Sequence, residues 1–219
     1  HMQPIFWLAA LILFGVEDNV MPTVNTKRIA WKDLKIVMTP AFVQLVILGT
    51  LFSLARFSNA FIVLRAADIG IEHAWIPMAL VLMNIAFSLS SYPFGKLADK
   101  LNPMKLLALG MVSLVLANLL FAYAANYRIL AAGIVLFGMH LGATQGIFST
   151  IISEIAPSEV RATAFGIFNF FSGLALLASG LVAGSLWEYM GAQYCFGGGV
   201  VFALITLCLI PRFKQLQPS

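Results

Sequence analysis

The sequence predicts an all-α integral membrane protein, a bundle of six transmembrane helices. Of the 219 residues, 61% are hydrophobic and only 10% are charged, whereas soluble domains carry about 45–50% apolar and about 25% charged residues. The apolar residues gather in runs of about 20 or more, the length that crosses a bilayer as a helix. Short polar segments rich in turn-forming residues separate these runs. Composition and patterning together argue against a soluble enzyme, a disordered chain and a nucleic-acid-binding module.

Six apolar runs are long enough to cross a bilayer as single helices. The expected spans are Thr39–Leu64, Ala74–Phe94, Lys105–Ala125, Arg128–Ile152, Ala162–Trp187 and Met190–Ile210. A seventh run, Pro4–Val16, is too short to span alone, so we interpret it as the end of a preceding transmembrane helix. The expected organisation is 1–38 for this helix end and a basic cytoplasmic linker, 39–212 for the six-helix bundle and 213–219 for a cytoplasmic tail. Within the linker, Trp31–Met38 is either a short amphipathic helix on the inner leaflet or simply a basic connection.

Basic residues are divided unequally between the two ends of the predicted bundle. Of the 13 Lys and Arg residues, ten fall on the side of the linker and the C-terminus, and only Arg65 and Arg128 fall on the opposite side. The remaining one, Arg56, lies within the first span. Because cytoplasmic loops carry an excess of Lys and Arg, we expect the C-terminus in the cytoplasm and the protein in the bacterial inner membrane. The net charge of +4 then reflects topology and requires no nucleic-acid partner.

Three segments resemble signatures of the major facilitator superfamily. Tyr92–Leu101, between the second and third spans, resembles that family's G-x-L-a-D-R loop, although Asn102 stands where a glycine is usual. Glu154–Gly166 resembles its P-x-x-x-R-(G/A)-T-A-x-G passage between helices ten and eleven, and Arg56–Leu64 resembles its seventh helix. The resemblance covers the chain from Thr39 to about Arg212.

The resemblance implies the C-terminal six-helix half of a twelve-helix transporter, built of two inverted three-helix repeats. The expected partners are the lipid bilayer, the N-terminal six-helix half and a small-molecule substrate bound between the halves near the midplane. The chain contains no G-x-x-x-x-G-K-[ST] sequence. We therefore expect a secondary active transporter that works by alternating access, coupled to protons, with export favoured over uptake.

Charged residues gather at the expected cytoplasmic ends of the spans. Asp99, Lys100, Glu154 and Arg161 are candidates for a latch that holds the inner ends of the helices in one conformation. Gly95 is expected to let two helices approach closely beside this cluster. The alternative is that these charges only mark the membrane interface.

Arg56 is the one basic residue inside a span. A charged residue at such depth costs about 2.5–3.5 kcal/mol on insertion scales and is expected to face a cavity or an anion. Ser53, Arg56 and Asn59 recur every third position, which predicts one shared helix face. This stripe either contacts an anionic substrate group or a coupling carboxylate, or Arg56 belongs to a structural ion pair. No Asp or Glu lies deep within any expected span of this chain.

His140 lies near the middle of the fourth span. It is either hydrogen-bonded to a neighbouring helix or a proton carrier, because only histidine has an ordinary pKa close to physiological pH. Asn84, Gln145 and Asn169 are further candidates that either line the pathway or bridge helices.

Glycines recur at helical spacing in three spans and predict close-packed faces. They are Gly138, Gly142 and Gly146 in the fourth span, Gly166, Gly173, Gly180 and Gly184 in the fifth, and Gly197–Gly199 in the sixth, where a bend or a close contact is expected.

Two other functions remain open at this point. A self-sufficient six-helix pore or dimeric transporter would work without a second half. An intramembrane hydrolase would need a serine, such as Ser149 or Ser172, beside His140, and no G-x-S-x-G motif is present. Because no spacing typical of a metal or cofactor site occurs, we expect neither group and no enzymatic activity.

Overall fold

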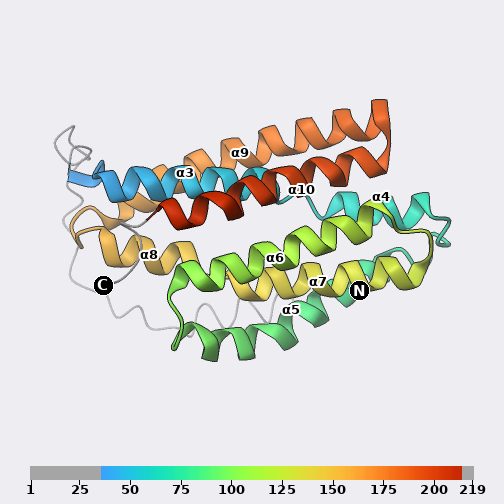
Figure 1. Ribbon diagram of the computed structural model, residues 1–219, viewed down its shortest axis with the longest axis horizontal. Coiled ribbons are helices and arrows are strands. Elements are labelled where there is room, and N and C mark those ends of the chain that lie inside the picture. Colours follow the sequence, from blue (N-terminus) through green and yellow to red (C-terminus); the bar gives the residue numbers. More distant parts are fainter. Residues whose placement is uncertain (1–35, 214–219) are drawn as a thin grey trace, which may run out of the picture. The chain divides into compact units, whose positions relative to one another are not determined.

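The computed structural model describes residues 36–213, and every part of this range is helical or a short connection. The helices are α3 (Pro40–Ala55), α4 (Ala60–Asp68), α5 (Pro77–Ala98), α6 (Pro103–Ala122), α7 (Tyr127–Thr144), α8 (Ile147–Ile155), α9 (Arg161–Met190) and α10 (Ala192–Leu209), followed by the 3₁₀ turn Ile210–Arg212 (Figure 1). The short run Pro4–Val16, the linker up to Lys35 and the tail after Phe213 lie outside the described residues.

Within the described residues, six segments are long and apolar enough to cross a membrane, as the sequence predicts. They are Pro40–Asp68, Pro77–Ala98, Pro103–Ala122, Tyr127–Ile155, Arg161–Met190 and Ala192–Arg212. Their bounds agree with the expected spans to within about one helical turn. The side-chain oxygens of Thr39, Asn102 and Asn126 cap the starts of α3, α6 and α7 by accepting backbone N–H bonds.

The first span consists of two helices, not one. α3 ends at Ala55 and α4 begins at Ala60, and Arg56 has an extended backbone between them. The expectation that Ser53, Arg56 and Asn59 share one continuous helix face is therefore wrong.

Side-chain hydroxyls explain how this break is tolerated at membrane depth. Ser179 of α9 donates a hydrogen bond of 3.2 Å to the carbonyl oxygen of Leu54. At the restart, the Oγ atom of Ser58 accepts the backbone N–H of Ala60 at 3.3 Å. Backbone groups that leave a helix inside a membrane need such partners, because lipid offers none.

The fourth span is also broken. α7 ends at Thr144, and α8 begins at Ile147 after Gly146, whose φ of 81° is left-handed. A left-handed residue cannot continue a right-handed helix, and glycine adopts this conformation without steric cost. The spacing of Gly146 from Gly138 and Gly142 predicted a packing face, but Gly146 serves as the breakpoint instead.

Two groups of three spans build the bundle. α3 packs against α9 and α10, whereas α7 packs against α5 and α6, and α6 packs against α10 across the centre (Figure 1). If the chain is divided into the repeats α3–α6 and α7–α10, each first span packs against the second and third spans of the other repeat. Exchanging the repeats leaves these neighbour relations unchanged, as expected for two inverted three-helix repeats.

The glycine faces divide into packed and open ones. A Cβ at Gly138 would lie 2.7 Å from the carbonyl oxygen of Met83 on α5, and one at Gly142 would meet the Oγ atom of Ser90. The predicted close packing of these two glycines is confirmed. A Cβ at Gly199 would lie 2.9 Å from the Nδ2 atom of Asn118, so the close contact expected in the sixth span is also present, whereas α10 continues through it without a break.

The other predicted glycine faces have no close contact within the described residues. A Cβ at Gly95, or at any of the four glycines of α9, would meet no atom within 4 Å among the described residues. The four are Gly166, Gly173, Gly180 and Gly184. The reason is that most of α9 lies on the outside of the bundle, where small residues meet no neighbouring helix of this chain.

Candidate functional site

The two helix breaks face each other across a cavity of about 210 Å³. Residues of α3 and its end form one wall, and residues of α7, α8 and the turn between them form the other. The lining residues are Phe52, Arg56, Leu141, Thr144, Gln145, Gly146, Phe148 and Ser149. A second cavity of about 340 Å³ is lined by Arg56, Phe57, Ser58, Asn59 and Leu176. Arg56 lines both cavities.

Arg56 lacks the ion-pair partner that a structural role would require. Its side chain is half-buried, and its Cζ atom lies 5.9 Å from the centroid of the Phe52 ring. Among the described residues, its guanidinium group makes no ion pair, whereas Arg65 pairs with Asp68. Arg56 therefore presents an uncompensated positive charge to the two cavities.

The second break adds to the positive potential of the smaller cavity. Gly146 is the N-cap residue of α8, and no side chain caps this helix start. The N-terminus of a helix carries a partial positive charge of about +0.5. Gly146, Phe148 and Ser149, all from this first turn, line the same cavity as Arg56. The cavity thus combines a cation, a helix N-terminus and a hydroxyl group.

The structure brings only some of the predicted pathway residues together. Gln145 lines the smaller cavity and Asn59 the larger one, each beside Arg56. Ser53 is buried and lines neither. Asn84 and Asn169 are exposed on α5 and α9, and Asn84 donates its side-chain N–H to the carbonyl oxygen of Leu80 in its own helix.

Sequence reasoning missed the aromatic walls of these cavities. The rings of Phe52 and Phe148 lie 5.1 Å apart in an edge-to-face arrangement, and Phe57 lines the larger cavity. These phenylalanines are three of 18 in the chain, and all three lie within the expected apolar spans. Phe52 and Phe57 are close to Arg56 in the sequence, and this closeness could have indicated that they share its cavities.

His140 lies behind the cavity rather than in it. The side chain is fully buried, and its Nδ1 atom donates to the carbonyl oxygen of Gly110 on α6 at 2.9 Å, because a carbonyl can only accept. The imidazole stacks on Phe52 with ring centroids 5.5 Å apart, so it reaches the cavity only through that ring. No hydrogen bond joins it to Ser149. This geometry fits the interpretation of a histidine that joins two helices.

The four charged latch candidates are not joined in this conformation. Asp99, Lys100 and Glu154 are exposed at the helix ends. Arg161 donates from Nη2 to the carbonyl oxygen of Ser153 at 3.0 Å, at the end of α8. In the described part of the chain no ion pair connects any two of the four.

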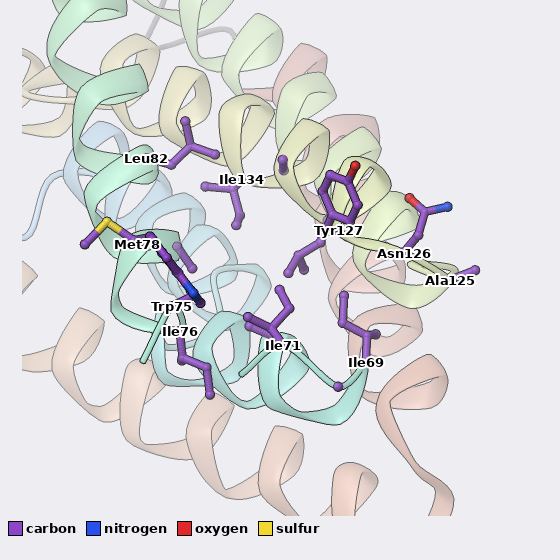
Figure 2. A pocket seen from close by; sticks show the side chains of 15 residues that line it. Ile69, Ile71, Trp75, Ile76, Met78, Leu82, Ala125, Asn126, Tyr127 and Ile134 are labelled. Atoms are coloured by element: carbon purple, nitrogen blue, oxygen red, sulfur yellow. The ribbon is translucent and has the colours of Figure 1, made fainter. Parts of the chain in front are cut away.

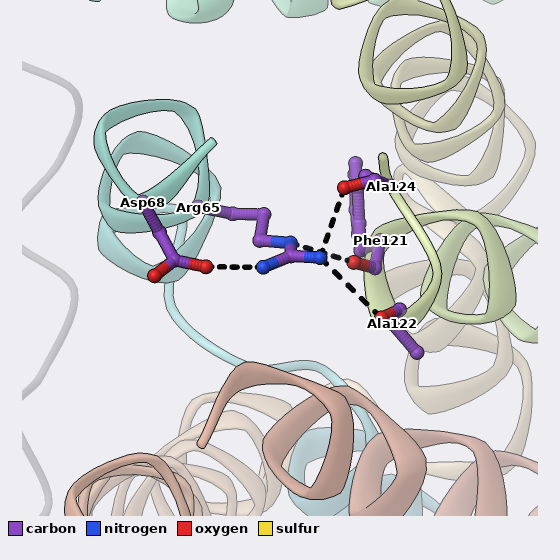
Figure 3. Close-up of polar contacts among 5 residues, drawn as sticks. All are labelled: Arg65, Asp68, Phe121, Ala122 and Ala124. Carbon is purple, nitrogen blue, oxygen red and sulfur yellow. Dashed lines mark hydrogen bonds and ion pairs between the residues drawn. The ribbon is translucent and has the colours of Figure 1, made fainter. Parts of the chain in front are cut away.

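A different arginine makes the most extensive polar contact of the bundle. Arg65 of α4 pairs with Asp68 and donates to the carbonyl oxygens of Phe121 (3.0 Å), Ala122 (3.5 Å) and Ala124 (3.0 Å) at the end of α6 (Figure 3). Only 13% of its side chain is exposed. Arg65 thereby caps the C-terminus of α6, where a cation is favourable.

The largest of these cavities, about 610 Å³, lies at the same end of the bundle as Arg65. Ile69, Trp75, Met78, Leu82 and Ile134 are among its lining side chains (Figure 2). Asn126, Tyr127 and the indole of Trp75 are its polar side chains, and no charged residue lines it. It is an apolar cavity without the charge that distinguishes the Arg56 site. No group of three or more His, Cys, Asp or Glu suited to a metal ion occurs within residues 36–213.

The sequence is similar to known membrane transporters. An uncharacterized MFS-type transporter of Methanocaldococcus jannaschii is 31% identical over 215 residues, which are 94% of this chain and 52% of the relative. The quinolone resistance protein NorA of Staphylococcus aureus is 31% identical over 160 residues, 64% of this chain and 40% of NorA. The glucose transporter GlcP of Staphylococcus epidermidis is 27% identical over 113 residues, 52% of this chain and 25% of GlcP.

The chain spans about a quarter to about half the length of these three relatives. Residues 45–218 match the sequence profile of the Major Facilitator Superfamily, and the six apolar spans of the described residues agree with that match. The chain belongs to the Major Facilitator Superfamily.

Proposed function

We propose that this chain is the C-terminal half of a secondary active transporter that moves a small solute across the membrane by alternating access. The observation that carries this proposal is the position of Arg56, a half-buried cation without an ion-pair partner among the described residues, between two half-helices. In membrane transporters, broken helices and intramembrane ionisable residues mark solute and ion pathways. The proposed solute site is the cavity of about 210 Å³ that Arg56 and Leu141 line.

The N-terminal six-helix half is the proposed partner. α5 and α9 are the least buried of the six spans, and Leu89 and Leu177 on them are 73% and 66% exposed. The chain spans 52% of the M. jannaschii relative, and a second half of similar size would cover these faces. The solute site would then lie between the two halves, enclosed by both.

Proton coupling and export are proposed as the mode of transport, in the bacterial inner membrane with a cytoplasmic C-terminus. The similarity to a quinolone resistance protein supports export. The basic residues Lys96, Lys100, Lys105, Arg161 and Arg212 all lie at one end of the bundle, which supports this topology. We also propose that Asp99, Lys100, Glu154 and Arg161 form their latch when the site is closed to the cytoplasm. Asp99→Asn should then favour the inward-open state.

Alternating access is tested without knowing the solute. A single cysteine replaces Leu141, which lines the cavity, in a full-length transporter without other cysteines. A membrane-impermeant thiol reagent should label this cysteine from both sides of the membrane. Reversing an imposed pH gradient should raise the rate of cysteine labelling from one side of the membrane and lower it from the other. If the cysteine is labelled from neither side of the membrane, the cavity is only a packing defect and the alternating-access proposal fails.

Reconstitution of the chain alone decides between a half and a complete transporter. In liposomes, residues 1–219 without a second polypeptide should give no quinolone flux driven by a pH gradient, whereas the full-length protein should. Gradient-driven flux through the chain alone would contradict the half-transporter proposal. It would favour a pore or a dimeric transporter instead.

A further inference from the structure

We propose that the solute bound at this site is an amphipathic organic anion, an aromatic or alkyl carboxylate whose negative group pairs with Arg56. This inference rests on the proposed function and names the substrate class of the same site. The juxtaposition behind it is an unpaired guanidinium group, a helix N-terminus and two phenylalanine rings around one cavity.

The charge of the site has one sign. Arg56 lines both cavities, and no Asp or Glu lines either. Acidic residues of the spans stand only at helix ends, as Asp68, Glu154 and Glu188 do. A partly buried charge in a membrane is costly unless a counter-charge reaches it. Within the described residues this chain provides none, and an anionic solute would supply it.

Hydrogen-bond donors surround the position that a carboxylate would occupy. The amide of Gln145 and the hydroxyl of Ser149 line the cavity together with Arg56. The start of α8, at Gly146, adds backbone N–H groups that no side chain caps. Arginine is well suited to carboxylates because its planar group donates two parallel hydrogen bonds.

The remaining wall is apolar and aromatic. Phe52 and Phe148 pack edge to face at 5.1 Å, and Leu141 adds to this apolar surface. An apolar body attached to the carboxylate would bury itself against these rings, which favours an amphipathic anion over an inorganic one. A fully hydrophilic ion such as phosphate would leave the rings without a partner.

Three probes of nearly equal size separate the effect of charge on binding from the effect of size. Benzoate, benzamide and benzylammonium are each tested for protection of the Leu141→Cys variant of the full-length transporter against an impermeant thiol reagent. Benzoate should protect at concentrations about ten- to a hundredfold lower than the neutral and cationic probes, the difference expected for charge-assisted hydrogen bonds. Equal or better protection by benzamide or benzylammonium, or no protection by any probe, overturns the inference.

Variants assign the effect to Arg56. Adding Arg56→Met should remove the preference for benzoate, whereas Arg56→Lys should retain part of it. The matched control is Arg128→Met, because Arg128 is an exposed arginine at the far end of α7. In this variant benzoate should protect the cysteine as well as it does in the parent. An unchanged melting temperature in detergent shows that each variant is folded, and protection is compared with the same variant's labelling rate without probe. Persistent benzoate preference in Arg56→Met contradicts the inference.

The outcomes distinguish the two proposals. If the cysteine is labelled from both sides but only benzylammonium protects it, the transporter proposal stands and the anion inference fails. If the cysteine is labelled from neither side, the cavity is not on a solute pathway and both fail.

Discussion

Arg56 and His140 are both polar residues inside apolar runs, yet the fold gives them different surroundings. Arg56 stands where a helix ends and lines two cavities. His140 is in the middle of α7, fully buried, with its Nδ1 atom bonded to Gly110. The sequence made both residues pathway candidates, because each is a polar, ionisable side chain inside an apolar span. Only the neighbouring helices separate a residue that faces a cavity from one that joins helices.

Substitution of His140 should change stability rather than proton coupling. Asparagine can place its side-chain N–H near the position of Nδ1 and keep the bond to Gly110, whereas leucine cannot. His140→Leu should lower the free energy of unfolding by about 1 kcal/mol, and His140→Asn by less, measured by thermal unfolding in detergent. His140→Asn should also keep the response of Leu141→Cys labelling to a pH gradient. Loss of that response at unchanged stability would make His140 the proton carrier.

At the scale of whole helices, the close packing of α7 against α5 depends on glycines of α7. Gly138→Ala would place a methyl group against the backbone of α5, 2.7 Å from the carbonyl oxygen of Met83. The helices must then separate, which should cost about 1–3 kcal/mol. Gly180→Ala on α9 is the control, since its Cβ would meet nothing within 4 Å among the described residues. Equal melting temperatures of the two variants would show that α5 moves without cost.

The half-helix α4 is held by Arg65 at the end of α6. Arg65→Met should leave the carbonyl oxygens of Phe121 and Ala124, and the carboxylate of Asp68, without their donor (Figure 3). We expect a loss of about 1–3 kcal/mol in the free energy of unfolding, seen as a lower melting temperature. Arg128→Met is the control, because the Arg128 side chain is exposed and contacts the neighbouring Tyr127. It should have the melting temperature of the parent. If both variants melt alike, the Arg65 contacts do not hold α4.

On the scale of the whole molecule, the distribution of basic residues predicts the orientation in the membrane. Lys100 lies at the basic end of the bundle and Tyr189, 82% exposed, at the other. In intact cells an impermeant maleimide should label a Tyr189→Cys variant and should reach Lys100→Cys only after permeabilisation. The reverse pattern would place the C-terminus outside the cytoplasm.

The sequence predicted the six spans well because a bilayer requires long apolar helices. Composition and the length of the apolar runs reveal such helices directly. It failed within the spans. The breaks at Arg56 and Gln145–Gly146 lie at polar residues within apolar runs, a pattern that does not by itself predict a helix end. The backbone partners at a break, such as Ser179 for Leu54, come from other helices. The glycine face of α9 has no neighbour among the described residues, and the spacing of the glycines alone does not reveal whether a helix has one.

By itself, the sequence determined the fold class, the number of spans, the resemblance to the Major Facilitator Superfamily and the presence of one charged residue at membrane depth. These features depend on hydrophobicity and local motifs, which need no knowledge of contacts. The tertiary structure decided that two spans are broken, that the breaks meet around Arg56 and that His140 is packed away from the cavity. Such features depend on which distant residues satisfy a freed backbone group or fill a space, and only the packed bundle brings those residues together.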